Sequence, residues 1–273
     1  MKARAWIALV AVYVVWGSTY LAIRFAVETI PPFLTAGIRF LVAGGALYIW
    51  QRLSGAPAPK KVEWRSASII GLLLLLGGNG MLNWAETRIP SGISSLFIGT
   101  VPLWMVLFDA FRPNGVKTNR LVWAGVLVGL VGTALLVNPW QSHTSSPAYN
   151  PLGIGVLIFA AISWSAGSLY SRKAPLPGSP LLGTGMEMLV GSLGLFVFAT
   201  ILGEWGQFHP AAISMPSLAG LAYLIVFGSG IGFVAYTWLL RNAPTHLVAT
   251  YAYVNPVVAI LLGNLVGHES LEV

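Results

Sequence analysis

Cysteine is absent from this 273-residue sequence, and charged residues make up only 8% of it. Without cysteine the chain can form neither a disulfide framework nor a thiolate metal site. A soluble domain carries about 25% charged residues, and a chain with so few could not cover a globular surface with polar groups. Because 56% of the residues are hydrophobic, the composition predicts a polytopic membrane protein whose solvent is the bilayer.

Motifs for catalysis and nucleotide binding are missing too. The sequence contains no Walker A motif and no H-E-x-x-H, and the G-S-G-I-G at 228–232 lacks the G-x-G-x-x-G spacing. The histidines are scattered over loops and the ends of apolar runs, at His143, His209, His246 and His268. We therefore expect no metal, no cofactor and no ATP-driven pump.

Long apolar runs, punctuated by proline and glycine, are what the sequence has in abundance. About 20 residues are needed to cross about 30 Å of hydrocarbon, and the backbone must be hydrogen-bonded internally there, which favours helices. An all-α architecture is thus predicted. The nine predicted spans are 5–27, 32–51, 68–87, 91–110, 120–139, 151–171, 180–203, 217–239 and 245–266.

Lysine and arginine gather in alternate loops. With the N-terminus inside, the outer loops hold only Arg88, while Arg24 lies near the outer end of the first span and Arg39 within the second. The remaining basic residues are cytoplasmic: Lys2, Arg4, Arg52, Lys60, Lys61, Arg65, Arg112, Lys117, Arg120, Arg172, Lys173 and Arg241. This bias predicts a cytoplasmic N-terminus. It also explains the net charge of +7 without a nucleic-acid partner.

The sequence contains an internal repeat. The segment W-G-S-T-Y-L-A-I-R at 16–24 is echoed by W-S-A-G-S-L-Y-S-R at 164–172, an offset of 148. At the same offset, A-G-I-R-F-L-V at 36–42 meets T-G-M-E-M-L-V at 184–190. At an offset of 154, a second set of counterparts is Trp84 with Trp238, Pro90 with Pro244 and Pro102 with Pro256.

Two related halves follow from this repeat, 1–142 and 143–273. Each half is built on five spans, and because five is odd the halves lie in opposite orientations across the membrane. Such inverted repeats are typical of secondary transporters, with substrate bound near the midplane between the halves. The counterpart of the fifth span would begin at about residue 273, so we expect a tenth span after the end of this sequence.

Five segments resemble the EamA repeat of the drug/metabolite transporter superfamily. They are W-G-S-T-Y-L-A-I-R-F (16–25), G-N-G-M-L-N-W-A-E (78–86), P-S-G-I-S-S-L (90–96), T-V-P-L (100–103) and Y-A-Y-V-N-P-V-V-A-I-L-L-G (251–263). The resemblance implies two EamA halves around a central cavity. It also implies a bacterial inner-membrane exporter of amino acids, notably aromatic ones, or of amphiphilic drugs and metabolites.

Three tryptophans lie well inside spans: Trp16, Trp104 and Trp164. They could line a cavity, stacking flat substrates or attracting organic cations. Equally, they could fill the gap between the halves, and a buried indole N–H needs a hydrogen-bond partner in either case.

Arg39 and Glu187 are repeat partners of opposite charge inside the membrane, where an ionised residue costs at least about 2.5 kcal/mol. Each lies roughly 10 Å from its nearer surface. They could bind the carboxylate and the amine of a zwitterion, respectively, or each could hold helices together through a local partner. Desolvation would also make Glu187 a candidate proton carrier.

The remaining candidates are polar or proline residues inside spans. Tyr20, Asn79, Tyr251 and Asn255 could bind a substrate's polar groups or bond across helices. Pro102 and Pro256 each remove a backbone donor, and are candidate gating bends or static kinks.

The small residues Gly125, Gly129 and Gly132 form one face of the fifth span. They indicate either close packing within a monomer or a homodimer contact. Taken together, the sequence predicts a secondary transporter that exports small amphiphilic metabolites, aromatic amino acids foremost, by alternating access. The alternative is a membrane enzyme acting on a lipid-linked substrate. It would need clustered acids or a metal motif at the interface, and the sequence has neither.

Overall fold

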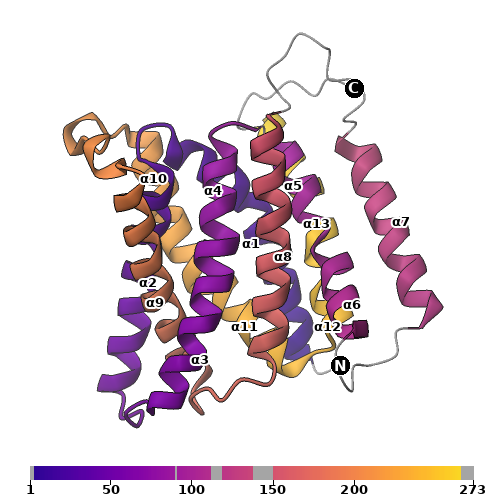
Figure 1. The fold of residues 1–273 in the computed structure, drawn as a ribbon, viewed down its shortest axis with the longest axis horizontal. Helices are drawn as coiled ribbons and strands as arrows, with labels where there is room; N and C mark the ends of the chain where they lie inside the picture. Colours follow the sequence, from indigo (N-terminus) through magenta and orange to yellow (C-terminus); the bar gives the residue numbers. More distant parts are fainter. Residues whose placement is uncertain (1–2, 90, 112–118, 138–149, 266–273) are drawn as a thin grey trace.

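The computed structural model describes residues 3–89, 91–111, 119–137 and 150–265, and the regular structure in these ranges is entirely helical (Figure 1). The predicted all-α fold class is therefore confirmed. The elements of the first half are α1 Ala3–Val27, α2 Pro32–Leu53, α3 Lys61–Gly71, η1 Leu72–Gly80, α4 Met81–Glu86, α5 Ser91–Ile98, α6 Val101–Phe111 and α7 Arg120–Val137. Those of the second half are α8 Pro151–Ser171, α9 Pro180–Ile201, η2 Glu204–Gly206, η3 Pro210–Ala212, α10 Met215–Tyr223, η4 Leu224–Phe233, α11 Val234–Asn242, α12 Thr245–Val248 and α13 Tyr251–Leu265.

Within the described residues, eight helical segments are long and apolar enough to cross a membrane, and a shorter apolar segment covers 120–132. These segments coincide with the nine predicted spans. The ends predicted for the fifth and ninth spans, at 139 and 266, lie outside the described residues. So does the boundary between the two halves, at 142 and 143.

The third span begins at Lys61, seven residues before its predicted start at 68. Its first turn is charged, so a search for apolar runs passes over it. The Glu63 carboxylate accepts a hydrogen bond from the backbone N–H of Lys60 at 2.6 Å, which satisfies one of the free donors at a helix start. The helix thus extends beyond the hydrocarbon-length core.

Proline marks the starts of three further helices. Pro32, Pro151 and Pro180 each occupy the first turn of α2, α8 and α9, where the missing N–H costs nothing. The side chain of Asn150 accepts hydrogen bonds from the next backbone N–H groups of α8, and Ser179 does the same for α9. The proline punctuation of the sequence therefore corresponds to real helix boundaries.

The middle of the third span and the middle of the eighth are π-helices, η1 and η4. An offset of 154 carries 72–80 onto 226–234, so the two wide-turn segments occupy matching places in the two halves. π-Helical turns are rare and often lie at functional sites, because they disturb the regular backbone hydrogen bonding. Nothing in the hydrophobic pattern distinguishes them from α-helix.

The fourth and ninth spans are each interrupted near a predicted proline bend. The fourth breaks between α5 and α6, and Pro102 is the second residue of α6. The ninth breaks between α12 and α13, while Pro256 lies inside α13, several residues beyond the break. The two repeat-partner prolines are therefore placed differently in their helices.

The halves pack against each other through matching contacts. Helix α2 lies along α9, α1 contacts η4 and α13, and α8 contacts η1, α5 and α6. In Figure 1 the third span rises from α3 to α4, whereas its counterpart descends from α10 to α11. Repeat-related spans thus run in opposite directions, as the inverted plan requires.

Helix α7, which carries the glycine face, packs on α13. A Cβ atom added to Gly129 would lie 2.6 Å from the Tyr253 ring, and the Tyr253 hydroxyl donates to the Val126 carbonyl at 3.2 Å. Intrachain packing therefore accounts for Gly129. The space beside Gly125 and Gly132 is open.

Glu204, in η2, is only 4% exposed and holds the start of α2. Its carboxylate accepts hydrogen bonds from the backbone N–H groups of Phe33 at 3.2 Å and Leu34 at 2.9 Å. Those groups have no partner within the helix, and the helix dipole favours a negative charge there. Burial raises the pKa of Glu204 above its ordinary 4.5, although the two hydrogen bonds act in the opposite direction.

Substituting Glu204 should therefore separate hydrogen bonding from charge. We expect Glu204→Ala to lower the free energy of unfolding by about 1–3 kcal/mol, because two buried N–H groups lose their acceptor. Glu204→Gln keeps an acceptor and should retain most of the stability. Folding raises the pKa of Glu204 above 4.5. The resulting contribution to the free energy of unfolding is therefore complete below pH 4.5 and is lost as the pH rises through the pKa of the folded state.

Thermal unfolding of the purified protein between about pH 4 and pH 8 measures both effects. We expect wild type to lose stability relative to Glu204→Gln as the pH rises. A difference between the two proteins that stays constant with pH would contradict the assignment.

Candidate functional site

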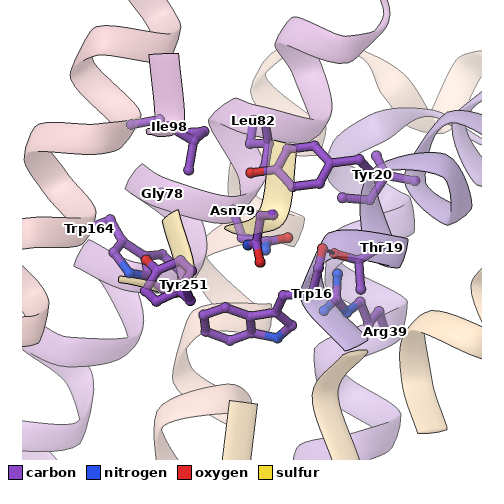
Figure 2. A pocket seen from close by; sticks show the side chains of 13 residues that line it. Trp16, Thr19, Tyr20, Arg39, Gly78, Asn79, Leu82, Ile98, Trp164 and Tyr251 are labelled. Atoms are coloured by element: carbon purple, nitrogen blue, oxygen red, sulfur yellow. Dashed lines mark hydrogen bonds between the residues drawn. The ribbon is translucent and has the colours of Figure 1, made fainter. Parts of the chain in front are cut away.

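A buried pocket lies near mid-depth where the two halves meet (Figure 2), and it encloses about 490 Å³ of empty space including its mouth. Both halves contribute to its lining, which consists of Trp16, Thr19, Tyr20, Ile23, Arg39, Gly78, Asn79, Leu82, Ile98, Ala160, Trp164, Tyr251 and Asn255.

Aromatic rings close one side of the pocket. The repeat partners Trp16 and Trp164 meet edge to face, with ring centroids 5.4 Å apart. Tyr251 packs against Trp16 at 5.2 Å, and Tyr236 packs behind these rings at 4.8 Å from Trp16. The Trp164 indole N–H donates to the Tyr236 hydroxyl at 2.9 Å, which also pairs with Ser168. The rings therefore form a hydrogen-bonded wall rather than a loose filling.

Each central tryptophan rests on a glycine of the opposite half. A Cβ atom on Gly78 would lie 2.7 Å from the Trp164 ring, and one on Gly232 would lie 2.5 Å from the Trp16 indole nitrogen. Gly78 and Gly232 are counterparts at an offset of 154, one in each π-helix. The Trp16 indole also donates to the Gly228 carbonyl at 3.1 Å. These glycines let the indoles approach the backbone directly.

Arg39 brings a charge to the pocket. Its guanidinium is 2% exposed, donates from Nε to the Ser229 hydroxyl at 2.7 Å and lies 4.7 Å from the Phe40 ring centroid. The Nη1 atom has no hydrogen-bond partner among the described residues. Figure 2 shows Arg39 beside Thr19 and Trp16, at the edge of the cavity.

Two asparagines supply unpaired acceptors. The side-chain oxygens of Asn79 and Asn255 are buried and have no partner in the described structure. Asn79 points into the middle of the cavity in Figure 2, and Asn255 also lines the pocket. The pocket therefore combines one cationic group, two amide oxygens and aromatic faces.

Seven of the nine predicted binding residues line this pocket, and two do not. Trp104 donates to the Thr100 hydroxyl at 3.2 Å and lies beside Phe108, outside the cavity. Glu187 is 1% exposed in α9, and neither of its carboxylate oxygens has a hydrogen-bond partner in the part of the chain that the structure describes. The charge of Arg241 on α11 acts on it. Arg39 and Glu187 are thus not opposite poles of one cavity.

Several residues of the site are not among those predicted from the sequence. These further lining residues are Thr19, Ile23, Gly78, Leu82, Ile98 and Ala160. The pairing of Gly78 with Gly232 at an offset of 154 was a signal that could have been found. Tyr236 corresponds to Leu82 of the first half at that offset, so the repeat gives no hint of its role.

A pocket lined by aromatic rings, between inverted halves of a helical membrane protein, is the arrangement typical of secondary transporters. Comparison with known proteins agrees: the EamA-like transporter family matches residues 3–138 and again 151–273. The chain belongs to the EamA-like transporter family, and the sequence resemblance is confirmed.

Two relatives that are named as transporters resemble the chain over nearly its whole length. The chain is 41% identical over 269 residues to the uncharacterized inner membrane transporter YedA of Escherichia coli, covering 97% of this chain and 83% of that protein. It is 22% identical over 271 residues to the uncharacterized transporter YoaV of Bacillus subtilis, covering 97% and 89%. A solved crystal structure superimposes with a TM-score of 0.74 at 22% identity, covering 99% and 90%, which supports the fold alone.

Proposed function

We propose that this protein is a secondary transporter of the bacterial inner membrane, with its N-terminus in the cytoplasm. It exports small amphiphilic metabolites, and aromatic amino acids are the first to test. The observation that carries the proposal is the pocket itself, where aromatic faces meet between the halves with one guanidinium nitrogen and two amide oxygens that have no hydrogen-bond partner among the described residues. Flat apolar bodies with a polar end match such a lining.

The aromatic rings and the polar side chains of the pocket would bind different parts of a substrate. The ring of a substrate packs on Trp16, Trp164 and Tyr251, while its carboxylate pairs with Arg39 in a charge-assisted hydrogen bond. An amine donates to the oxygens of Asn79 and Asn255. This arrangement replaces the predicted amine site at Glu187, which lies outside the cavity.

Alternating access is the proposed mechanism, and the matched contacts of the two halves support it. Trp164 rests on Gly78 as Trp16 rests on Gly232, but only Trp16 donates to a π-helix carbonyl, whereas Trp164 donates to Tyr236. Rocking one half against the other would exchange the hydrogen-bonding roles of Trp16 and Trp164. The same movement would open the site to the opposite side of the membrane.

An export assay tests the proposed function. Bacteria that overproduce the protein are loaded with a phenylalanine-containing dipeptide, and phenylalanine in the medium is followed over time. We expect faster release than from cells with an empty vector, and release of the unmodified amino acid. Equal release from both strains, or recovery of a chemically altered product that depends on the protein, would contradict it.

Glu187 is the proposed proton carrier, although it lies outside the pocket. It is a buried carboxylate whose oxygens are unpaired in the described structure, in a helix that packs along α2, which carries Arg39. We expect Glu187→Gln to abolish the response of substrate flux to an imposed pH gradient while exchange of substrate for substrate continues. Flux into proteoliposomes with and without the gradient measures this. A response retained in the variant would remove Glu187 from the mechanism.

A further inference from the structure

The electrostatic balance of the membrane interior singles out Arg39. Among the described residues, the charged side chains that are buried are Arg39, Glu187 and Glu204. The positive charge of Arg241 acts on Glu187, and Glu204 accepts hydrogen bonds from the start of α2. Arg39 forms no ion pair with any described acidic residue. Its guanidinium donates a hydrogen bond to the neutral hydroxyl of Ser229.

A second acidic residue near the pocket, Glu86, is also acted on by a basic residue. Glu86 follows the pocket residue Leu82 by one helical turn and acts electrostatically on the Tyr20 ring. The positive charge of Arg24 acts on Glu86 in turn. Neither Glu86 nor Glu187 lines the pocket. The cavity wall therefore carries one positive charge and no negative one.

An uncompensated buried guanidinium is costly, because a charge removed from water must be paired or solvated. The Nη1 atom has unused hydrogen-bonding capacity beside the pocket. A carboxylate, sulfonate or phosphate ester would supply the missing charge and accept its hydrogen bonds. The pocket as it stands is complementary to an anion.

We infer that the pocket ranks substrates by charge, with amphiphilic aromatic anions first, zwitterions second and organic cations last. The inference rests on the proposed function and narrows its substrate class. A zwitterion must also desolvate its ammonium group, for which the wall offers neutral oxygens and aromatic faces but no carboxylate among its described residues. A cation of the same shape meets the uncompensated charge of Arg39 at close range.

Three ligands with one ring and one chain length test the ranking: 3-phenylpropionate, L-phenylalanine and 2-phenylethylamine. They differ only in which of the two charged groups they carry. Binding to the full chain in nanodiscs at neutral pH can be measured by calorimetry. We expect 3-phenylpropionate to bind several-fold more tightly than phenylalanine and at least about tenfold more tightly than 2-phenylethylamine.

Variants of Arg39 identify the cause of the ranking. Arg39→Gln should weaken 3-phenylpropionate binding about tenfold or more and leave 2-phenylethylamine unchanged or tighter. Arg39→Lys keeps the charge and should keep the order of the three ligands. The order measured for wild type needs no variant, so the inference stays testable if Arg39→Gln does not fold.

The outcomes separate this inference from the function on which it rests. A wild-type preference for phenylalanine or for 2-phenylethylamine over 3-phenylpropionate would overturn the ranking alone. So would an unchanged affinity of folded Arg39→Gln for 3-phenylpropionate. Absence of binding by all three ligands would overturn the proposed function together with the ranking.

Discussion

Replacing Gly232 with alanine is expected to lower the transport rate at least about tenfold in a protein that still folds. The new methyl group would lie 2.5 Å from the indole nitrogen of Trp16 and 2.7 Å from Cδ1. No side chain tolerates such a contact, so the indole must move. It can move only by breaking its hydrogen bond to Gly228 and by disturbing its packing on Trp164 and Tyr251. Both changes deform the pocket wall.

Gly230→Ala is the matched control for this prediction. Gly230 lies two residues away in the same π-helix, but a Cβ atom there would meet only the Ile225 carbonyl at an ordinary 3.5 Å. We expect this variant to transport like wild type. Equal rates for both alanine variants would show that the Trp16–Gly232 contact has no part in transport, and loss in both would point to the π-helix as a whole.

Replacing Gly71 with alanine should have the largest effect on stability. Gly71 lies where α3 crosses α9, and an added Cβ atom would lie 2.3 Å from the backbone oxygen of Glu187 and 3.0 Å from the backbone nitrogen of Gly191. Backbone atoms cannot rotate away as a side chain does, so the helices must separate. Overpacking of this kind costs about 1–3 kcal/mol or more.

Gly45→Ala provides the opposite expectation in a comparable membrane helix. Gly45 lies in α2 with no neighbouring atom within 4 Å of the added Cβ, and alanine restricts the unfolded chain more than glycine does. We expect Gly71→Ala to lower the unfolding temperature and the yield of monodisperse protein, and Gly45→Ala to leave both unchanged or raised. Thermal unfolding followed by size-exclusion chromatography measures both. A stable Gly71→Ala protein would contradict the close crossing.

Much of the fold could be predicted from sequence because membrane spans obey simple constraints. The length of apolar runs gives the helices, and prolines such as Pro32, Pro151 and Pro180 mark where three of them start. The internal repeat brought Trp16 and Trp164 together as counterparts. Because inverted halves meet at their symmetry axis, residues near that axis contact their own counterparts, and the two indoles do.

The parts that could not be predicted depend on how each helix is rotated about its axis. A helix that is apolar all round has no preferred face in its sequence. Arg39 and Glu187 are counterparts in the repeat, yet only Arg39 faces the pocket. The π-helices were missed for a related reason, since an i→i+5 turn has the same composition as an i→i+4 turn.

Counterflow in proteoliposomes tests most directly whether substrate crosses the membrane through the pocket between the two halves. Vesicles containing wild type, Gly230→Ala or Gly232→Ala are loaded with unlabelled 3-phenylpropionate or phenylalanine and diluted into labelled substrate. We predict a transient accumulation of label above equilibrium with wild type and Gly230→Ala, and little or none with Gly232→Ala. Wild-type vesicles that accumulate no more label than protein-free vesicles, for either substrate, would contradict the account.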